Sequence, residues 1–289
     1  MGDQPAASHK LPMQIQRLLS QTRYVAAMGS SFLQKLRLFY YAALKPSLAF
    51  RGVAKYSADR IVSFSIKPKH RRTLEVHVRD NGVGMITIAE FFSQHSPIIP
   101  ANLPPLHPKV IYDLGANIGI ASLYFSSLYP DATVYGFEPL PENLVVCALN
   151  YRNMPASSQA FPWAVGAQTG IAVFDCQNDS RGGRLESSQH DPKLKTTGKM
   201  EVQVYSIADL ILKKGLLPPD FVKIDVEGAE LDVLKGLEEH YRGVKWIYIE
   251  THGDELKKQC LHWLETRDYK VWPGVDDTAI WGGRVEVVA

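Results

Sequence analysis

The chain has 289 residues, of which 45% are hydrophobic and 21% are charged, and its formal net charge is +2. This composition is typical of a soluble globular enzyme with one substantial α/β core and an appendage. No segment contains the roughly eighteen uncharged apolar residues of a membrane span, and the first residues lack a signal-peptide pattern. We therefore expect a cytoplasmic protein.

The cysteines argue against a zinc protein and against a disulfide-linked protein. Cys147, Cys176 and Cys260 are odd in number and lack the spacing of metal ligands. We expect reduced thiols in or near the core, and neither a zinc site nor a disulfide framework.

The N-terminal segment is basic. Residues 1–75 contain 13 Lys or Arg and three Asp or Glu, a net charge of +10 against −8 for the remainder. Between Leu11 and Leu44, apolar residues recur at near-helical spacing and predict one or two amphipathic helices. These helices either pack on the rest of the protein or present a basic face to an anionic membrane or a lipid-linked substrate. No basic-aromatic motif accompanies the charge, so we expect no nucleic-acid partner.

Two alternating segments, Ile61–Ile66 and Thr73–Val78, predict a β-hairpin. A break at Asn81–Gly84 precedes a short helical stretch, and the proline-rich run from Pro97 to Pro108 marks a linker. We expect a cap over residues 1–106 and a main domain over residues 107–289. Arg79, at the end of the hairpin, either binds substrate from the cap or is an exposed turn residue.

The most informative segment runs from Val110 to Gly119. Its apolar part ends at Asp113, and Gly115, Asn117 and Gly119 follow. A strand that ends in a glycine turn and leads into a helix lets backbone N–H groups approach a cofactor closely. The Gly-x-Gly-x-x-Gly order of dinucleotide sites is missing, and Asp113 would repel a pyrophosphate. An acid here suits a ligand with a sulfonium or ammonium group, such as S-adenosylmethionine.

A second apolar segment, Thr133–Phe137, ends at Glu138 and Pro139. In a parallel sheet, an acid at the end of the neighbouring strand can accept hydrogen bonds from ribose hydroxyls. Glu138 is therefore the predicted ribose ligand, with Pro139 in the same cofactor-binding set. Further along, the polar run from Asn178 to Lys199 predicts a long loop, either a mobile lid on the acceptor side or a plain flexible excursion.

Two later strands also end in polar residues. Phe221–Ile224 is followed by Asp225, Glu227 and a helical pattern, and the strand from Trp246 ends at Glu250 and His252. Because ligands of open α/β sheets bind at the carboxyl ends of the strands, we expect these side chains to line one site.

Together these blocks resemble the FkbM family of class I S-adenosylmethionine-dependent methyltransferases. The matching residues are Asp113–Gly119, Phe137–Asn143, Lys223–Glu230 and Ile249–His252. The resemblance implies a Rossmann-like α/β fold, a mainly parallel twisted sheet with helices on both faces. It also implies S-adenosylmethionine as the cofactor and O-methylation of a sugar, glycolipid or polyketide macrolide.

Two positions qualify the resemblance. It places Trp163 and Ala164 beside the adenine ring, although Trp163 is equally a candidate core residue. Where the family usually has Leu-Asp-Asp-Leu, this chain has Ala208 in place of the first acid. If that acid shapes the acceptor site, the family's substrate class is less secure for this chain.

Methyl transfer to a hydroxyl is an in-line displacement that also requires removal of a proton. His252 is the first candidate base, because imidazole titrates near neutral pH, and Asp225 is the rival near the transferring methyl group. Glu227 and Glu250 are expected to bind acceptor hydroxyls, together with His252. Convergence of Asp225, Glu227 and Glu250 would suit magnesium, but the sequence contains no metal motif and we predict no metal.

Two other classes of function compete with this hypothesis. A nicotinamide-dependent oxidoreductase is disfavoured by the glycine pattern. A catalytically silent protein could use the fold and bind a partner or membrane through its basic segment, but it would have no physical need for Asp113, Gly115, Glu138 and Asp225. Neither the acceptor nor an oligomeric state has a readable motif.

Overall fold

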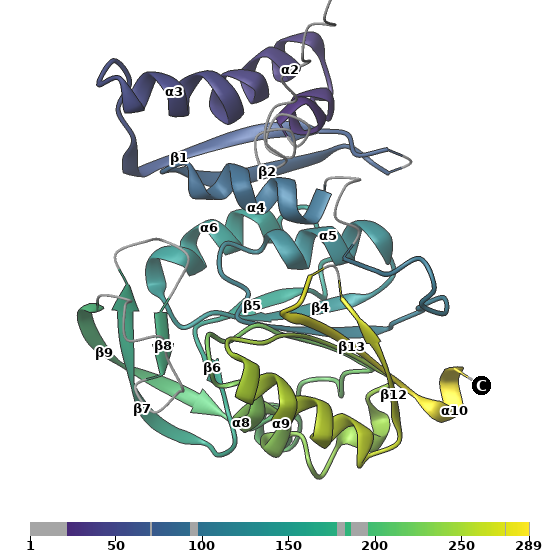
Figure 1. The fold of residues 1–289 in the computed structure, drawn as a ribbon. Helices are drawn as coiled ribbons and strands as arrows, with labels where there is room; N and C mark the ends of the chain where they lie inside the picture. The colour runs from purple at the N-terminus through teal and green to yellow at the C-terminus, as the bar shows by residue number, and fades with distance from the viewer. Residues whose placement is uncertain are drawn as a thin grey trace, which may run out of the picture.

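The computed structural model describes residues 22–69, 71–92, 98–177, 183–185, 196–274 and 276–288. In this part of the chain a seven-stranded sheet has the order β12-β13-β11-β10-β3-β4-β5 (Figure 1). Neighbouring strands are parallel except at β13, which is antiparallel to both β11 and β12. The prediction of a mainly parallel α/β sheet is confirmed. The strands are β3 (Val110–Leu114), β4 (Thr133–Phe137), β5 (Gln159–Phe161), β10 (Phe221–Ile224), β11 (Trp246–Glu250), β12 (Tyr269–Pro273) and β13 (Ala279–Arg284).

Helices cover both faces of this sheet (Figure 1). Within β3, Ile111 packs into the core cluster on the α5 side and Tyr112 into the cluster on the α8 side. Strands buried on both faces need apolar side chains on both, which is why they form continuous apolar runs in the sequence. One face carries α5 (Ile120–Leu128) and α6 (Pro141–Tyr151), and the other carries α7 (Ile207–Leu212), α8 (Glu230–Gly236) and α9 (Asp254–Glu265). Two short helices complete the fold: η2 (Tyr241–Gly243) precedes β11, and α10 (Val285–Val288) follows β13.

A layer of helices and a hairpin lies above α5 and α6 (Figure 1). It contains a helical turn at 22–27, α2 (Phe32–Phe39), the π-helical η1 (Tyr40–Leu44), α3 (Lys45–Phe50), β1 (Ser57–Ile66), β2 (Leu74–Asp80) and α4 (Val83–Phe92). The strands β1 and β2 pair antiparallel with Phe64 opposite Val76, which confirms the predicted hairpin. Both residues share a core cluster with Phe125 of α5. This layer therefore shares one core with the helices that cover the sheet.

The predicted N-terminal helices are present from residue 22 onward, and the beginning of their pattern lies outside the described residues. Leu38 of α2 is buried, whereas Phe32 and Leu33 are 74% and 75% exposed. In the described ranges, no helix combines the length and the apolar character needed to cross a bilayer. Contact of the basic segment with a membrane surface stays a prediction.

A second, mainly antiparallel sheet extends beyond β5. It contains β6 (Ala164–Val165), β7 (Gly170–Gln177), β8 (Gly183–Leu185) and β9 (Thr196–Tyr205). The predicted loop from Asn178 to Lys199 is wrong for β8 and for the first residues of β9. Cys176 pairs with Gly183 and Asp175 pairs with Lys199. These strands form although their side chains are polar, because strand pairing hydrogen-bonds the backbone N–H and C=O groups whatever the side chains. Residues 178–182 and 186–195, where the rest of the predicted lid falls, lie outside the described residues.

Candidate active site

The turn after β3 is held between the ends of two neighbouring strands. Gly115 has a φ of 75°, and a Cβ at this position would lie 1.8 Å from the backbone oxygen of Asp225. The Gly115 N–H donates to the carbonyl of Phe137 at the end of β4. Only glycine combines this backbone conformation with such a close approach, so the predicted tight turn is confirmed at Gly115.

Glu138 ties this turn to the next strand. Its carboxylate accepts hydrogen bonds of 2.9 Å from the backbone N–H groups of Asn117 and Leu140. Burial raises the pKa of Glu138 to about 7, although these two N–H groups act in the opposite direction. The side chain is only 4% exposed, and it fixes the position of Asn117, whose φ is 50°.

The raised pKa of Glu138 predicts a pH-dependent stability. Folding raises this pKa from 4.5 to about 7. The contribution of Glu138 to the unfolding free energy is therefore complete below pH 4.5 and is lost as the pH rises through 7. We expect the unfolding free energy to fall by about 3 kcal/mol from this group between pH 5 and 8.5, as measured by urea denaturation. The Glu138→Gln variant should show a flatter profile, and the exposed Glu142→Gln variant should keep the wild-type slope. Parallel profiles for the wild type and Glu138→Gln would contradict this assignment.

A buried lysine lies beneath the turn. Lys223 of β10 is 2% exposed, and its Nζ lies 3.1 Å from Oδ1 of Asp113 and 3.2 Å from Oδ2 of Asp225. It also donates a 3.1 Å hydrogen bond to the carbonyl of Gly115. Burial lowers the pKa of Lys223, but the two carboxylates outweigh this effect and raise it. Lys223 therefore stays charged and joins the ends of β3 and β10.

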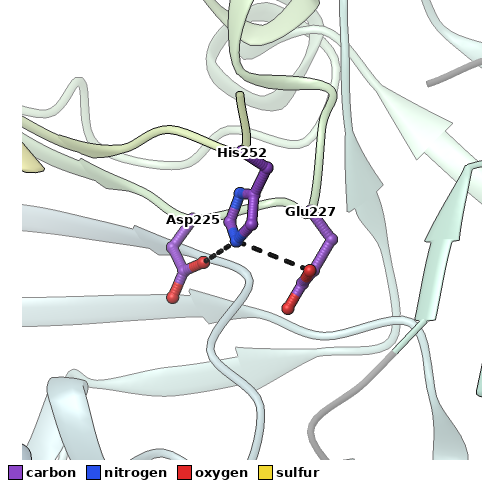
Figure 2. A group of neighbouring side chains, drawn as sticks. All are labelled: Asp225, Glu227 and His252. Carbon is purple, nitrogen blue, oxygen red and sulfur yellow. Dashed lines mark ion pairs between the residues drawn. The ribbon is translucent and has the colours of Figure 1, made fainter. Parts of the chain in front are cut away.

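Figure 2 shows the side chains of Asp225, Glu227 and His252 turned toward one another. The Nε2 atom of His252 lies 3.9 Å from Oδ1 of Asp225 and 3.5 Å from Oε2 of Glu227. On the other side of the ring, Nδ1 lies 2.9 Å from Oε1 of the buried Glu230. Glu227 is held with a φ of 52°, a conformation that L-residues seldom adopt outside functional or strained sites.

The electrostatics of this group favour positive charge at its centre. Burial lowers the pKa of His252, but the carboxylates of Glu230, Glu227 and Asp225 outweigh it and raise the pKa. The charge of Asp225 raises the pKa of Glu250 at the end of β11, and burial acts in the same direction. The acids therefore act on one another as a single cluster.

One cavity of about 350 Å³ brings the turn and the acids together. It is lined by six of the predicted site residues, namely Gly115, Asn117, Asp225, Glu227, Glu250 and His252, and by Lys223, Thr87, Glu90 and Phe91. The last three come from α4, outside the sheet. The carboxyl ends of β3, β10 and β11 thus form one edge with a shared cavity, as expected for an open α/β sheet.

The sequence profile described as "Methyltransferase FkbM domain" matches residues 113–271, more than half of the chain. The chain belongs to the FkbM methyltransferase family. It is 29% identical over 222 residues to "Methyltransferase sdnD" of Sordaria araneosa, a match that covers 63% of this chain and 80% of the relative. It is also 29% identical over 195 residues to "2-O-methyltransferase NoeI" of Sinorhizobium fredii, covering 64% of this chain and 79% of the relative.

A solved structure, "Methyltransferase FkbM from Methylobacillus flagellatus", aligns with a TM-score of 0.45 and 17% identity. The alignment covers 93% of this chain and 60% of that chain.

Other predicted FkbM site residues lie outside the cavity. Asp113 is fully buried beneath it, where it accepts a hydrogen bond from Ser122 and pairs with Lys223. Gly119 precedes α5, and a Cβ there would lie 3.0 Å from Sγ of Cys147. Pro139 follows Glu138 on the β4 side.

Trp163, Ala164 and Arg79 do not line this cavity either. The Trp163 ring stacks on Phe161 at 4.6 Å between ring centres, and Ala164 is buried at the start of β6. Arg79 donates a hydrogen bond to the backbone carbonyl of Glu142 on α6. Arg79 therefore contacts α6, and its role in binding the substrate stays a prediction. The sequence placed Arg79 at the end of the hairpin but did not show which way its side chain points.

The departure from the usual family sequence does not involve the cavity. Ala208 lies in the first turn of α7, which begins after Ser206 on the face of the sheet that carries α8. The following Asp209 pairs with Lys213 at 2.8 Å. Neither Ala208 nor Asp209 lines the cavity that contains the FkbM motifs.

A second cavity of about 1090 Å³ adjoins the first. It lies among the N-terminal helices, α4 and β11, and most of its lining is apolar, including Val25 and Phe39. Glu90, Phe91 and Glu250 line both cavities. The contribution of α4 was missed in the sequence, where the only signal was a short helical stretch after Asn81–Gly84.

Proposed function

We propose that this methyltransferase uses S-adenosylmethionine and methylates a hydroxyl on a natural-product acceptor with an extended apolar portion, of the polyketide or glycolipid kind. The observation that carries the proposal is the single cavity at the carboxyl ends of β3, β10 and β11, where the glycine turn meets the acids. The name of the relative NoeI, a 2-O-methyltransferase, supports oxygen as the acceptor atom.

The residues around the cavity fit the cofactor. The backbone of Gly115, Ala116 and Asn117 lines one wall without bulky side chains, and Asp225, Glu227 and Glu90 supply negative charge at the other. Such a donor set favours a positively charged sulfur over a pyrophosphate. When bound, S-adenosylmethionine supplies a methyl group on a sulfonium that becomes a neutral thioether after transfer.

Glu138 and the adjoining residues serve the remainder of the cofactor in this proposal. A carboxylate has about four lone-pair positions, and Glu138 uses two of its own for the N–H groups of Asn117 and Leu140. The side chain of Asn143 is a third partner, and the remaining position is proposed for a ribose hydroxyl. Pro139, Trp163 and Ala164 follow β4 and β5 and are proposed for the adenine side. Asp113 acts indirectly by holding Lys223 under the turn.

The larger cavity supports an acceptor with an apolar body. Its walls are mainly apolar, and it meets the smaller cavity at Glu90, Phe91 and Glu250. An acceptor held there can present one hydroxyl at this junction, where Asp225, Glu227, Glu250 and His252 offer polar contacts. Holding the two reactants in line at near-contact distance contributes roughly 7–11 kcal/mol to such a transfer.

The role of His252 can be tested with one variant. We expect the wild type to bind S-adenosylhomocysteine but not NAD in calorimetry, and to transfer isotope-labelled methyl groups to hydroxylated apolar acceptors. His252→Ala should lower turnover by about 10²–10⁴-fold with S-adenosylhomocysteine affinity intact, because His252 lies among the acids and not at the glycine turn. Asp232→Asn, an exposed acid of α8, is the control.

Two results would argue against this function. Wild-type turnover by the His252→Ala variant would remove His252 from the mechanism. Tight binding of S-adenosylhomocysteine without turnover on any hydroxylated acceptor would favour the alternative, a catalytically silent binding protein.

A further inference from the structure

We propose that Asp225, Glu227 and His252 form a binding site for a divalent cation, Mg²⁺ or Mn²⁺. Each residue offers one ligand atom, and the three atoms lie within 4.8 Å of one another. They come from the turn after β10 and from the residues after β11, and they converge as Figure 2 shows. The sequence predicted no metal because the ligands are separated along the chain and follow no metal motif.

The distances between the ligand atoms agree with a common metal ion. Bonds of about 2.1 Å place neighbouring ligand atoms of an octahedral ion about 3 Å apart and opposite ones about 4.2 Å apart. Nε2 of His252 lies 3.5 Å from Oε2 of Glu227 and 3.9 Å from Oδ1 of Asp225. Both separations lie between these two values, so small side-chain movements would bring the atoms to octahedral positions around a cation.

Glu230 provides an independent reason to assign a ligand role to His252. Its Oε1 accepts from the backbone N–H of Gly228 at 3.0 Å and lies 2.9 Å from Nδ1 of His252. A carboxylate only accepts hydrogen bonds, so Nδ1 carries the hydrogen and the lone pair of a neutral ring is on Nε2, facing Asp225 and Glu227. A buried carboxylate behind a histidine is the usual partner of a metal-bound imidazole.

The burial and charge of Glu230 strengthen this argument. Its side chain is fully buried, and in the described part of the chain its Oε2 has no hydrogen-bond partner. The carboxylates of Asp113, Asp225, Glu227 and Glu230 gather around Lys223 and His252. Among the described residues, these four carboxylates outnumber the cationic groups of Lys223 and His252, and a dication would reduce the excess negative charge.

The ligand set indicates the kind of ion. The two carboxylates suit Mg²⁺ or Mn²⁺, and the imidazole nitrogen favours Mn²⁺ over Mg²⁺, which prefers oxygen ligands. The three residues line the 350 Å³ cavity together with Glu90 and Glu250. The remaining positions of the ion would be open to the junction of the two cavities at Glu90 and Glu250, where the acceptor hydroxyl is proposed to bind.

In one respect this inference rests on the proposed function, because it gives the cation a role in methyl transfer. An acceptor hydroxyl bound to the cation becomes more acidic. Its O–H bond breaks and the proton passes to the carboxylate of Glu250. The oxygen then forms a bond to the methyl carbon while the carbon–sulfur bond breaks, and the sulfur keeps the electron pair of that bond. Asp225 and His252 thus act on the hydroxyl through the ion.

The site can be tested without measuring catalysis. The full chain is treated with a chelator and titrated with Mn²⁺, and the free ion is followed by electron paramagnetic resonance. We expect one Mn²⁺ per chain, displaced by excess Mg²⁺. Glu227→Gln and His252→Ala should each weaken binding at least tenfold, and Glu230→Gln should weaken it about 10- to 100-fold although Glu230 does not touch the ion.

Asp232→Asn is the control, because Asp232 is an exposed acid of α8 that lines neither cavity. It should retain the wild-type Mn²⁺ affinity. Absence of a Mn²⁺ site in the wild type, or an equal loss in Asp232→Asn and Glu227→Gln, would overturn the inference. Thermal melting of each variant separates lost binding from lost folding.

A parallel titration with S-adenosylhomocysteine separates this inference from the proposed function. If the product binds and Mn²⁺ does not, the cation site is rejected while the function stands. If Mn²⁺ binds and the product does not, the site is supported and the function fails.

Discussion

Replacement of Gly115 by alanine is expected to abolish detectable binding of S-adenosylhomocysteine and to destabilise the fold. The new Cβ would lie 1.8 Å from the backbone oxygen of Asp225, in a backbone conformation with a φ of 75°. Strain of this kind costs about 1–3 kcal/mol before any clash is counted. Relief of the clash must move either the turn or Asp225. Calorimetric titration should show a loss of at least about 100-fold in affinity, equivalent to about 2.7 kcal/mol.

Gly170→Ala is the control for this prediction. Gly170 lies in β7, where an added Cβ would meet no atom within 4 Å. This variant should bind the product as the wild type does. If Gly115→Ala also bound normally, the turn after β3 would not form the cofactor wall.

Replacement of Lys223 by methionine is expected to lower the unfolding free energy by about 3–5 kcal/mol, because it leaves the fully buried Asp113 without its cation. The Nζ of Lys223 lies 3.1 Å from Asp113 and 3.2 Å from Asp225. Without it, the two carboxylates repel each other near the end of the sheet. Urea denaturation at neutral pH measures the loss.

Two further variants define the cause. Lys235→Met removes an exposed lysine paired with Asp232 on α8, and it should cost less than about 1 kcal/mol. The double variant Lys223→Met/Asp113→Asn should recover part of the stability, because it removes one of the two unpaired charges. A loss for Lys223→Met no larger than that of the control would contradict the proposed ionic link.

The sequence was sufficient for the parallel strands of the sheet and for the acids at their carboxyl ends, but it did not predict the antiparallel strands β12 and β13. Asp225 and Glu250 lie at the ends of mainly apolar strands, and parallel strands place such ends along one side. Gly115 could be predicted because its turn chemistry is local. The role of Asp113 could not be predicted from its local sequence, because its partner, Lys223, comes from a strand more than a hundred residues later.

The cap contribution depends on tertiary packing and could not be predicted in this way. Glu90 and Phe91 reach the cavity because α4 packs on α5, and nothing in their local sequence marks them. The strand β8 was missed for a related reason, since its pairing with β7 uses backbone groups that composition does not report. Lys223 did carry a signal, because a lone lysine in an apolar strand needs a buried partner.

The two cavities, which meet at Glu90, Phe91 and Glu250, are formed mainly by different parts of the chain. In the proposed function, the family-matched residues 113–271 hold the methyl donor, whereas α4 and the helices before it form most of the larger cavity, which holds the acceptor. Substitutions in the first hundred residues can therefore change the shape of the larger cavity while the proposed methyl-donor site is preserved. A grafted N-terminal region would offer a direct route to new acceptor preferences.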